Sequence, residues 1–447
     1  MRRSVLKVLM LLPAGGAVML AGALLLNVSA VSKPASEHAP PANSIAQQRL
    51  FSQGRDVFRN DTFGDQAFWG GALHLHKAIE GSKLGGVGAG LSPRNALAAG
   101  LKVDAAALPR AVVQAIKKGK VDLDSPKTTL ALLKLNAVVG VKGFFNAKGT
   151  LSSIGLTCAV CHSTVDNSFA KGIGRRLDGW ANRDLNVGAV ISLAPNLKPV
   201  TDLLGADEAT VKKALASWGP GKFDAKLFLD GKAFMPDGRS AATLIPAAYG
   251  LYGVNLATYT GFGQMTYWNA FVANLELHGQ GNFLDQRLND PTQFPVATRA
   301  GLFDVRHSPD LVTSKLGALQ YYQLGLKPPA PPEGSYDVAA AKRGKAIFDG
   351  KGKCSSCHVP PTFSEPGSNL HKPAEICTDS FEADRSPTGA YRTTPLRGLW
   401  ARAKGGFYHD GRYQSLGAVV DHYNSCFGLS LTTRERGDLV QYLKSIH

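Results

Sequence analysis

The sequence contains Cys158-Ala159-Val160-Cys161-His162 and, much later, Cys354-Ser355-Ser356-Cys357-His358. Both stretches have the pattern Cys-x-x-Cys-His, which is typical of covalent c-type haem attachment. Two thiols three positions apart can form thioethers to the two vinyl groups of one porphyrin, and the next residue then lies beneath the iron. The pattern therefore predicts two c-type haems, attached at Cys158, Cys161, Cys354 and Cys357, with His162 and His358 as proximal iron ligands.

Three other interpretations of the motif compete with haem attachment. A thioredoxin-like pair needs no following histidine and would not be expected twice in one chain. A four-cysteine zinc site usually has a much shorter gap than the one between Cys161 and Cys354. Chance is conceivable for one copy but is a poor explanation for two.

A proline-rich segment divides the chain. Residues 327–334, Lys-Pro-Pro-Ala-Pro-Pro-Glu-Gly, cannot continue a helix and predict a stiff linker between haem domains at 45–326 and 335–447. Each domain opens similarly, with Gly54-Arg55-Asp56-Val57-Phe58 in the first and Gly344-Lys345-Ala346-Ile347-Phe348 in the second. The first motif cysteine follows this glycine by 104 residues in one domain and by 10 in the other. We therefore expect a largely helical insertion at about 65–150, whose aromatic run at 63–69 shapes a substrate or partner surface.

The remaining pattern predicts helices. Apolar residues at three- and four-residue spacing predict helices over 109–116, 128–135, 207–218, 416–423 and 433–446. No convincing run of alternating strands is present. The chain has 447 residues, 44% of them hydrophobic and 19% charged, which is an ordinary globular composition. The predicted fold class is mainly α, with two tandem cytochrome c-like haem domains, the first enlarged by the insertion.

The N-terminus predicts export to the periplasm. Arg2, Arg3 and Lys7 precede an uncharged, mostly apolar run and then the small residues Val28-Ser29-Ala30. This order is typical of a secretory signal peptide at 1–30, and a mobile tether at 31–44 would follow it. An uncleaved membrane anchor is the alternative, and membrane contact is expected only in that case.

The formal net charge of +16 indicates either a solvated basic surface or docking to an acidic redox partner protein. No nucleic-acid-binding motif is present, so a nucleic acid partner is not expected. The two cysteines outside the motifs, Cys377 and Cys426, are predicted to form a disulfide in an exported protein. Two unpaired, buried thiols are the alternative.

The sixth ligand of each iron decides between simple electron transfer and reaction with peroxide or dioxygen. None of the five methionines follows the second motif, so the C-terminal domain cannot supply a methionine ligand. The candidates near the second haem are His371, His409, His422, Tyr423 and His447, of which His371 and His447 are expected to be solvated. The candidates near the first haem are Met235, Met265, His278, His307 or no residue.

Two further runs, Arg392-Thr393-Thr394-Pro395-Leu396-Arg397 and Phe407-Tyr408-His409-Asp410-Gly411, precede the helix that begins near Leu416. With the two haem motifs, they make the sequence resemble the bacterial di-haem cytochrome c peroxidase family. That family includes the di-haem enzyme that matures the tryptophylquinone of methylamine dehydrogenase, and the di-haem rubber oxygenases are more distant relatives. The resemblance covers about 335–447 well and the rest loosely.

The resemblance implies roles for several residues. The peroxidases take a methionine from the helix near 416 as a haem ligand, whereas the quinone-forming relative takes a tyrosine. Tyr423 stands at the matching position and is the candidate sixth ligand of the second haem, with His409 and His422 as alternatives. Trp268 is a weak match to the tryptophan between the family's haems, and core packing is its competing interpretation. Glu276 is a loose candidate for the family's distal glutamate.

The sequence thus favours an exported di-haem c-type oxidoreductase, peroxidase-like or oxidase-like. Peroxide or dioxygen would react at the His162 haem, and the His358 haem would relay electrons. The main alternative is a non-catalytic electron-transfer cytochrome, and a haem-based sensor or structural subunit is a weaker one.

Overall fold

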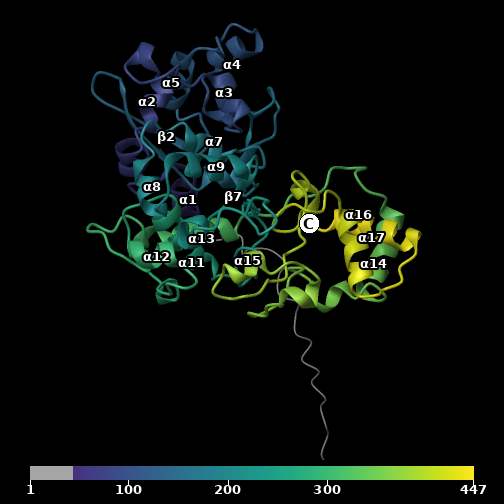
Figure 1. The fold of residues 1–447 in the computed structure, drawn as a ribbon. Helices are drawn as coiled ribbons and strands as arrows, with labels where there is room; N and C mark the ends of the chain where they lie inside the picture. Colours follow the sequence, from purple (N-terminus) through teal and green to yellow (C-terminus); the bar gives the residue numbers. More distant parts are fainter. Residues whose placement is uncertain (1–43) are drawn as a thin grey trace, which may run out of the picture. The chain divides into compact units, whose positions relative to one another are not determined.

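Helices dominate the part of the chain that the structure describes, which is residues 44–447 of a computed structural model (Figure 1). The predicted signal peptide and all but the last residue of the tether lie outside the described residues. The α-helices are α1 (Ile45–Asn60), α2 (Leu75–Glu80), α3 (Pro93–Ala98), α4 (Arg110–Lys117), α5 (Pro126–Lys134), α6 (Ala159–His162), α7 (Val187–Ser192), α8 (Lys198–Leu204), α9 (Glu208–Trp218), α10 (Leu227–Asp230), α11 (Met265–Phe271), α12 (Pro295–Ala300), α13 (Leu316–Leu324), α14 (Val338–Asp349), α15 (Phe381–Asp384), α16 (Leu416–Cys426) and α17 (Thr433–Ser445). The mainly α fold class is confirmed.

All five helices predicted from spacing are present, as α4, α5, α9, α16 and α17. Helix α17 begins with a capping box in which the Thr432 side chain accepts from the Glu435 backbone and the Glu435 side chain accepts from the Thr432 backbone. Two short π-helices, η1 (Ala67–Ala72) and η4 (Val272–Glu276), also form. The 3-10 turns are η2 (Ser82–Leu84), η3 (Ala105–Ala107), η5 (Gln286–Leu288), η6 (Thr313–Lys315), η7 (Cys354–Ser356), η8 (Pro373–Ile376) and η9 (Leu399–Arg402).

Short strands form where the sequence analysis expected none. The longest pair is an antiparallel hairpin of β2 (Val141–Phe145) and β3 (Leu151–Leu156), at the end of the segment expected to be largely helical. Its side chains do not alternate cleanly between buried and exposed, because the last three residues of β3 are all buried. The period-two signal of a strand is therefore missing from the sequence. The other pairs are β1 (Val103–Asp104) with β5 (Ile173–Gly174), β4 (Ser163–Val165) with β6 (Arg176–Asp178), β7 (Lys222–Phe223) with β8 (Thr243–Leu244) and β9 (Phe283–Leu284) with β10 (Asp304–Val305).

Two helix pairs are built alike. Helix α1 packs on α13 at Gly54, where a Cβ atom would lie 1.9 Å from the carbonyl oxygen of Ala318. Helix α14 packs on α17 at Gly344, where a Cβ atom would lie 2.0 Å from the carbonyl oxygen of Asp438. Only glycine permits so close an approach of two backbones. The similar openings noted in the sequence therefore occupy equivalent places in the two pairs.

The aromatic contacts of the two pairs also correspond. Phe58, four residues after Gly54, lies 5.5 Å from the ring of Tyr322 on α13. Phe348, four residues after Gly344, lies 5.2 Å from the ring of Tyr442 on α17.

Three buried hydrophobic clusters surround these elements. The largest is formed by residues between 58 and 322, and a second by residues between 229 and 305. The third is formed by residues between 348 and 446. Each cluster lies on one side of residues 327–334, which form no helix or strand. The carbonyl oxygen of Pro329 in that segment accepts a 3.0 Å hydrogen bond from the Trp400 indole. The division into two haem domains stays a prediction.

Buried ion pairs connect residues 224–230 with α15 and its end. Arg385 is 1% exposed and pairs with Asp230 at 2.6 Å and with Asp224 at 3.0 Å. Lys226, also buried, pairs with Glu382 at 2.6 Å. Breaking a buried pair by removing one partner typically costs about 3–5 kcal/mol, because the other charge stays buried. None of the helices in residues 44–447 is long and apolar enough to cross a membrane.

Candidate functional site

The first Cys-x-x-Cys-His motif follows the hairpin directly. Strand β3 ends at Leu156, and the short helix α6 carries Cys161 and His162. The Nδ1 atom of His162 lies 3.1 Å from the carbonyl oxygen of Pro246. A carbonyl oxygen only accepts, so Nδ1 carries the proton and Nε2 carries the lone pair. Burial lowers the pKa of His162 to about 4, which keeps the ring neutral and able to bind a metal.

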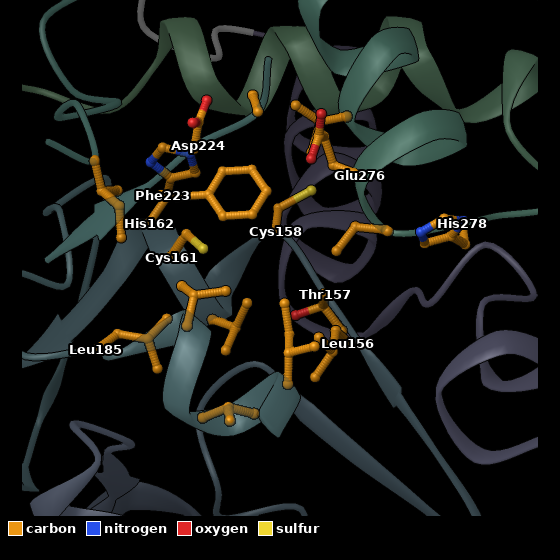
Figure 2. Close-up of a pocket in the computed structure, with 18 of the residues that line it drawn as sticks. Leu156, Thr157, Cys158, Cys161, His162, Leu185, Phe223, Asp224, Glu276 and His278 are labelled. Atoms are coloured by element: carbon orange, nitrogen blue, oxygen red, sulfur yellow. The ribbon is translucent and has the colours of Figure 1, made fainter. Parts of the chain in front are cut away.

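A cavity of about 250 Å³ opens beside this motif (Figure 2). Cys158, Cys161 and His162 line it together with many aliphatic and aromatic side chains. Burial raises the pKa of each thiol to about 12, so both stay protonated. An apolar cavity with two neutral thiols and a neutral imidazole fits a covalently attached porphyrin.

Glu276 is the acidic residue that stands out in the cavity wall (Figure 2). It is the last residue of η4, and both of its carboxyl oxygens are buried without a hydrogen-bond partner in the described structure. Burial, with a smaller contribution from the charge of Asp224, raises its pKa well above the ordinary value. Burial thus favours the protonated form of Glu276, whose carboxyl group can give or take a proton inside the cavity.

The aromatic run at 63–69 holds the segment that follows Glu276. The indole of Trp69 donates a 3.0 Å hydrogen bond to the carbonyl oxygen of Leu277. The ring of Phe68 stacks on the His278 ring at 3.6 Å. Phe68, Trp69 and His278 all line the cavity, and burial lowers the pKa of His278 to about 4. The predicted insertion thus contributes to the wall around the first motif.

The other candidates near the first motif are dispersed. Trp268 and Met265 line the cavity, and Trp268 stacks on Phe271 at 4.6 Å. Met235 lies in a turn, where its amide donates to the carbonyl oxygen of Arg239 at 2.7 Å. His307 is exposed. The structure therefore brings Trp268, Glu276, Met265 and His278 to the cavity with His162, but not Met235 or His307.

The second motif repeats the proximal geometry. Turn η7 carries Cys354, and His358 follows after Cys357. The Nδ1 atom of His358 lies 3.0 Å from the carbonyl oxygen of Phe363, which again leaves the lone pair on Nε2. Burial lowers the pKa of His358. Both motif histidines are thus neutral and oriented through Nδ1 by a backbone carbonyl.

Two tyrosines lie close together near the second motif. Burial raises the pKa of Tyr423 on α16, and the neighbouring Cys357 and Cys354 raise it further. The Tyr408 ring lies 6.1 Å from the Tyr423 ring, and an interaction between the two hydroxyls offsets part of the rise in the pKa of Tyr423. The sequence analysis quoted Tyr408 within a run but gave it no role. Its backbone φ of +69° orients it in a way that sequence spacing does not predict.

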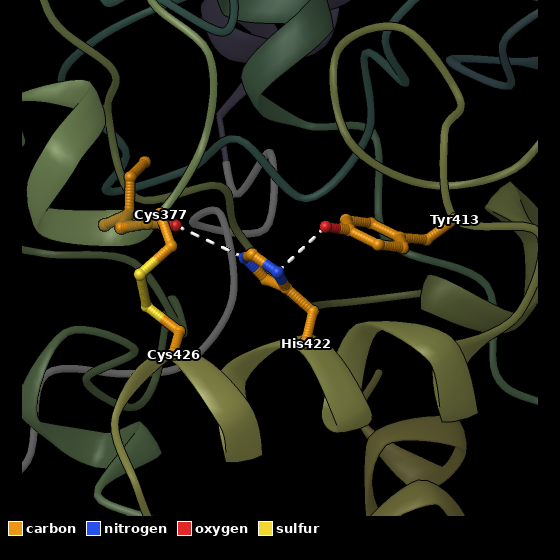
Figure 3. Close-up of a disulfide and its surroundings, with 5 residues drawn as sticks. Cys377, Tyr413, His422 and Cys426 are labelled. Atoms are coloured by element: carbon orange, nitrogen blue, oxygen red, sulfur yellow. Dashed lines mark hydrogen bonds between the residues drawn. A yellow bond between two sulfur atoms is a disulfide. The ribbon is translucent and has the colours of Figure 1, made fainter.

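His409 and His422 have other partners. His409 is buried, stacks on Tyr391 at 5.2 Å and places Nε2 3.5 Å from an Asp379 carboxyl oxygen. The Nδ1 atom of His422 lies 2.8 Å from the Tyr413 hydroxyl, and its Nε2 lies 3.3 Å from the carbonyl oxygen of Ile376 (Figure 3). Both ring nitrogens of His422 are therefore engaged.

Helix α16 is also tied at its end. Cys377 and Cys426 form a disulfide that joins the last residue of α16 to the residue after η8 (Figure 3). Cys426 lies three residues after Tyr423, about one helical turn along α16. Of the two histidines expected to be solvated, His447 is exposed, whereas His371 is half-buried and bonded to Glu365.

No protein-family model matches the chain. The methylamine utilization protein MauG of Methylorubrum extorquens is 34% identical over 128 residues, which cover 24% of this chain and 35% of MauG. An uncharacterized protein y4iM of Sinorhizobium fredii is 26% identical over 237 residues, which cover 43% of this chain and 48% of that protein. The chain thus spans about a third to a half of the length of these relatives.

Two solved structures superimpose weakly on about half of the chain. A MauG-like protein associated with microbial copper homeostasis superimposes with a TM-score of 0.32 and 15% identity, over 50% of this chain and 81% of that one. The diheme peroxidase BthA of Burkholderia thailandensis gives 0.31 and 15%, over 52% and 78%. The sequence match with MauG confirms, over part of the chain, the resemblance to the bacterial di-haem cytochrome c peroxidase family.

Proposed function

We propose that the chain is an exported di-haem c-type cytochrome oxidoreductase, in which peroxide or dioxygen reacts at the His162 site and the His358 site relays electrons. The observation that carries this proposal is the cavity that gathers His162, both motif thiols and the unpartnered Glu276. A simple electron-transfer site has no use for a buried acid without a partner, because such a group costs free energy.

The residues of the first site have distinct roles in this proposal. Haem attached at Cys158 and Cys161 supplies the iron that reacts with peroxide or dioxygen. His162, whose ring is oriented by its hydrogen bond to Pro246, would hold that iron through Nε2. The carboxyl of Glu276, whose protonated form is favoured by burial, would give a proton to bound peroxide and take one back. The aliphatic wall excludes water, which favours proton exchange with Glu276 over exchange with solvent.

The second site offers different side chains as the sixth ligand of its haem iron. Tyr423 lies near the motif cysteines, whereas His409 and His422 are engaged with other groups. We therefore propose Tyr423 as the sixth ligand of the His358 haem. An anionic oxygen ligand favours ferric iron, so this haem is expected to have a lower potential than a histidine–methionine haem. The excess of basic residues supports an acidic redox partner, and the N-terminal pattern supports a periplasmic location.

The proposal is tested on the purified protein and on Glu276→Gln. We expect two haems per chain by pyridine haemochrome analysis and a high-spin ferric signal in low-temperature EPR, as purified or after half-reduction. Glu276→Gln is expected to keep both haems and to lose peroxide turnover by about 10²–10⁴-fold. Trp268→Phe tests separately whether that candidate takes part in turnover. Two low-spin signals at every redox level, without peroxide or dioxygen consumption, would replace this proposal with the electron-transfer alternative.

A further inference from the structure

Two buried arginines, Arg392 on the cavity wall and Arg183, share Tyr259 and Arg402 as neighbours. Arg392 lines the cavity that contains His162, and its Nη1 atom is buried without a hydrogen-bond partner. Arg183 is 9% exposed, and its Nε and Nη1 atoms are both buried without partners in the described structure. A guanidinium is always charged and normally pairs when buried, so these atoms are costly as they stand.

The surroundings of both arginines are neutral or positive. The groups that act on the Arg183 charge are Tyr259, Arg402 and Tyr249, and those that act on Arg392 are Arg402 and Tyr259. Burial, reinforced by Arg402, lowers the pKa of Arg392 to about 10. Within residues 44–447, no carboxylate forms an ion pair with either guanidinium.

The nearby Arg385 provides a comparison within the same chain. It is buried more deeply than Arg183, yet it pairs with both Asp224 and Asp230. Burial of an arginine therefore does not by itself prevent this chain from pairing it with a carboxylate. Arg392 donates through Nε to the carbonyl oxygen of Thr258 and Arg183 interacts with the Tyr259 hydroxyl, but neither has a carboxylate partner within residues 44–447, which indicates that their anion comes from outside the polypeptide.

We propose that Arg183 and Arg392 form a binding site for carboxylate groups, and that these groups are the propionates of the haem attached at Cys158 and Cys161. The proposal rests on the proposed function. The vinyl and propionate groups of a protoporphyrin lie at opposite edges of the ring, so a haem attached at Cys158 and Cys161 would present its carboxylates away from those cysteines. A planar guanidinium binds a carboxylate through two parallel hydrogen bonds, which neutralises both charges.

The position of Arg392 links this site to the second motif. Thr394, two residues further on, contributes a backbone interaction with His358. The segment 392–394 therefore contacts the cavity of the first motif with one residue and the second proximal histidine with another. Pairing at Arg392 would order the stretch of chain that lies between the two candidate haem sites.

The test uses the holoprotein, with Arg183→Gln, Arg392→Gln and the charge-keeping Arg183→Lys and Arg392→Lys. Arg94→Gln is the matched control, because Arg94 is exposed and paired with Asp124 far along the chain. The measurement is made at an ambient potential that half-reduces the haem attached at Cys158 and Cys161 in the wild type. Loss of a positive charge beside this haem favours its ferric form, so we expect the Gln variants to lower its reduced-to-oxidised ratio about tenfold. The Lys variants should keep most of the ratio but shift the propionate bending mode in resonance Raman spectra. Ratios equal to those of Arg94→Gln in both Gln variants would overturn the proposal.

A second arm separates bound propionate from a free anion. Acetate is titrated into wild-type holoprotein while the haem spectrum is recorded. No saturable change is expected, because the propionates already occupy the site. A saturable change that Arg392→Gln abolishes would assign the site to a free carboxylate and overturn the haem assignment. Unchanged ratios in the Gln variants, together with peroxide turnover by the wild type, would contradict this inference but not the proposed function. Lowered ratios in the Gln variants, with no turnover by the wild type, would contradict the proposed function but not this inference.

Discussion

Gly344 provides the sharpest test of how the C-terminal helices pack. An alanine Cβ atom at this position would lie 2.0 Å from the Asp438 carbonyl oxygen and 2.9 Å from the Tyr442 Cβ atom. Contacts of this kind need more than 3 Å, and the obstacle is backbone, so α14 and α17 would have to separate by about 1 Å. Overpacking of this kind costs about 1–3 kcal/mol or more, against a gain of about 1 kcal/mol in helix propensity. We expect Gly344→Ala to lower the free energy of unfolding by up to about 2 kcal/mol.

Gly437 is a matched control on the partner helix. It lies in α17 next to Asp438, and a Cβ atom there would meet nothing within 4 Å. Gly437→Ala should therefore gain the higher helix propensity of alanine without a steric clash, and it should stabilise the protein by about 1 kcal/mol. Urea unfolding of the holoprotein, followed by circular dichroism at the helix band, compares the two variants. If Gly344→Ala were as stable as Gly437→Ala, the close packing of the two helices would be refuted.

Three further changes test other parts of the structure. Gly54→Ala should repeat the loss of stability in urea unfolding, because its Cβ would lie 1.9 Å from a backbone oxygen, whereas Gly317→Ala meets nothing within 4 Å and should not. Tyr423→Met should raise the potential of the His358 haem and shift its absorption spectrum; an unchanged potential and spectrum would exclude Tyr423 as a ligand. Replacing Cys377 and Cys426 together by serine should cost up to about 4 kcal/mol, because the disulfide closes a loop of sequence separation 49, and a melting temperature equal to that of the wild type would contradict this.

The sequence predicted the features that depend on local spacing. The haem motifs, the five periodic helices and the paired Gly54 and Gly344 openings are all readable within short windows. Trp69 and Leu277 meet across 208 residues, and no local pattern marks that hydrogen bond. Arg183 and Tyr408 were missed for a related reason. The identity of an arginine or a tyrosine in the sequence does not indicate which polar groups will surround its side chain in the folded protein.

The disulfide at the end of α16 has a consequence for how the protein is made. Under the proposed function, the other four cysteines, which are unpaired in the structure, must remain thiols until their thioethers form. A reductant that keeps them free can also reach Cys377, because this residue is exposed. A premature oxidant would in turn join the two cysteines of either motif, Cys158 to Cys161 or Cys354 to Cys357, since the shortest loops close most readily. We therefore expect the order of maturation to be fixed, with haem attachment first and oxidation of Cys377 and Cys426 last.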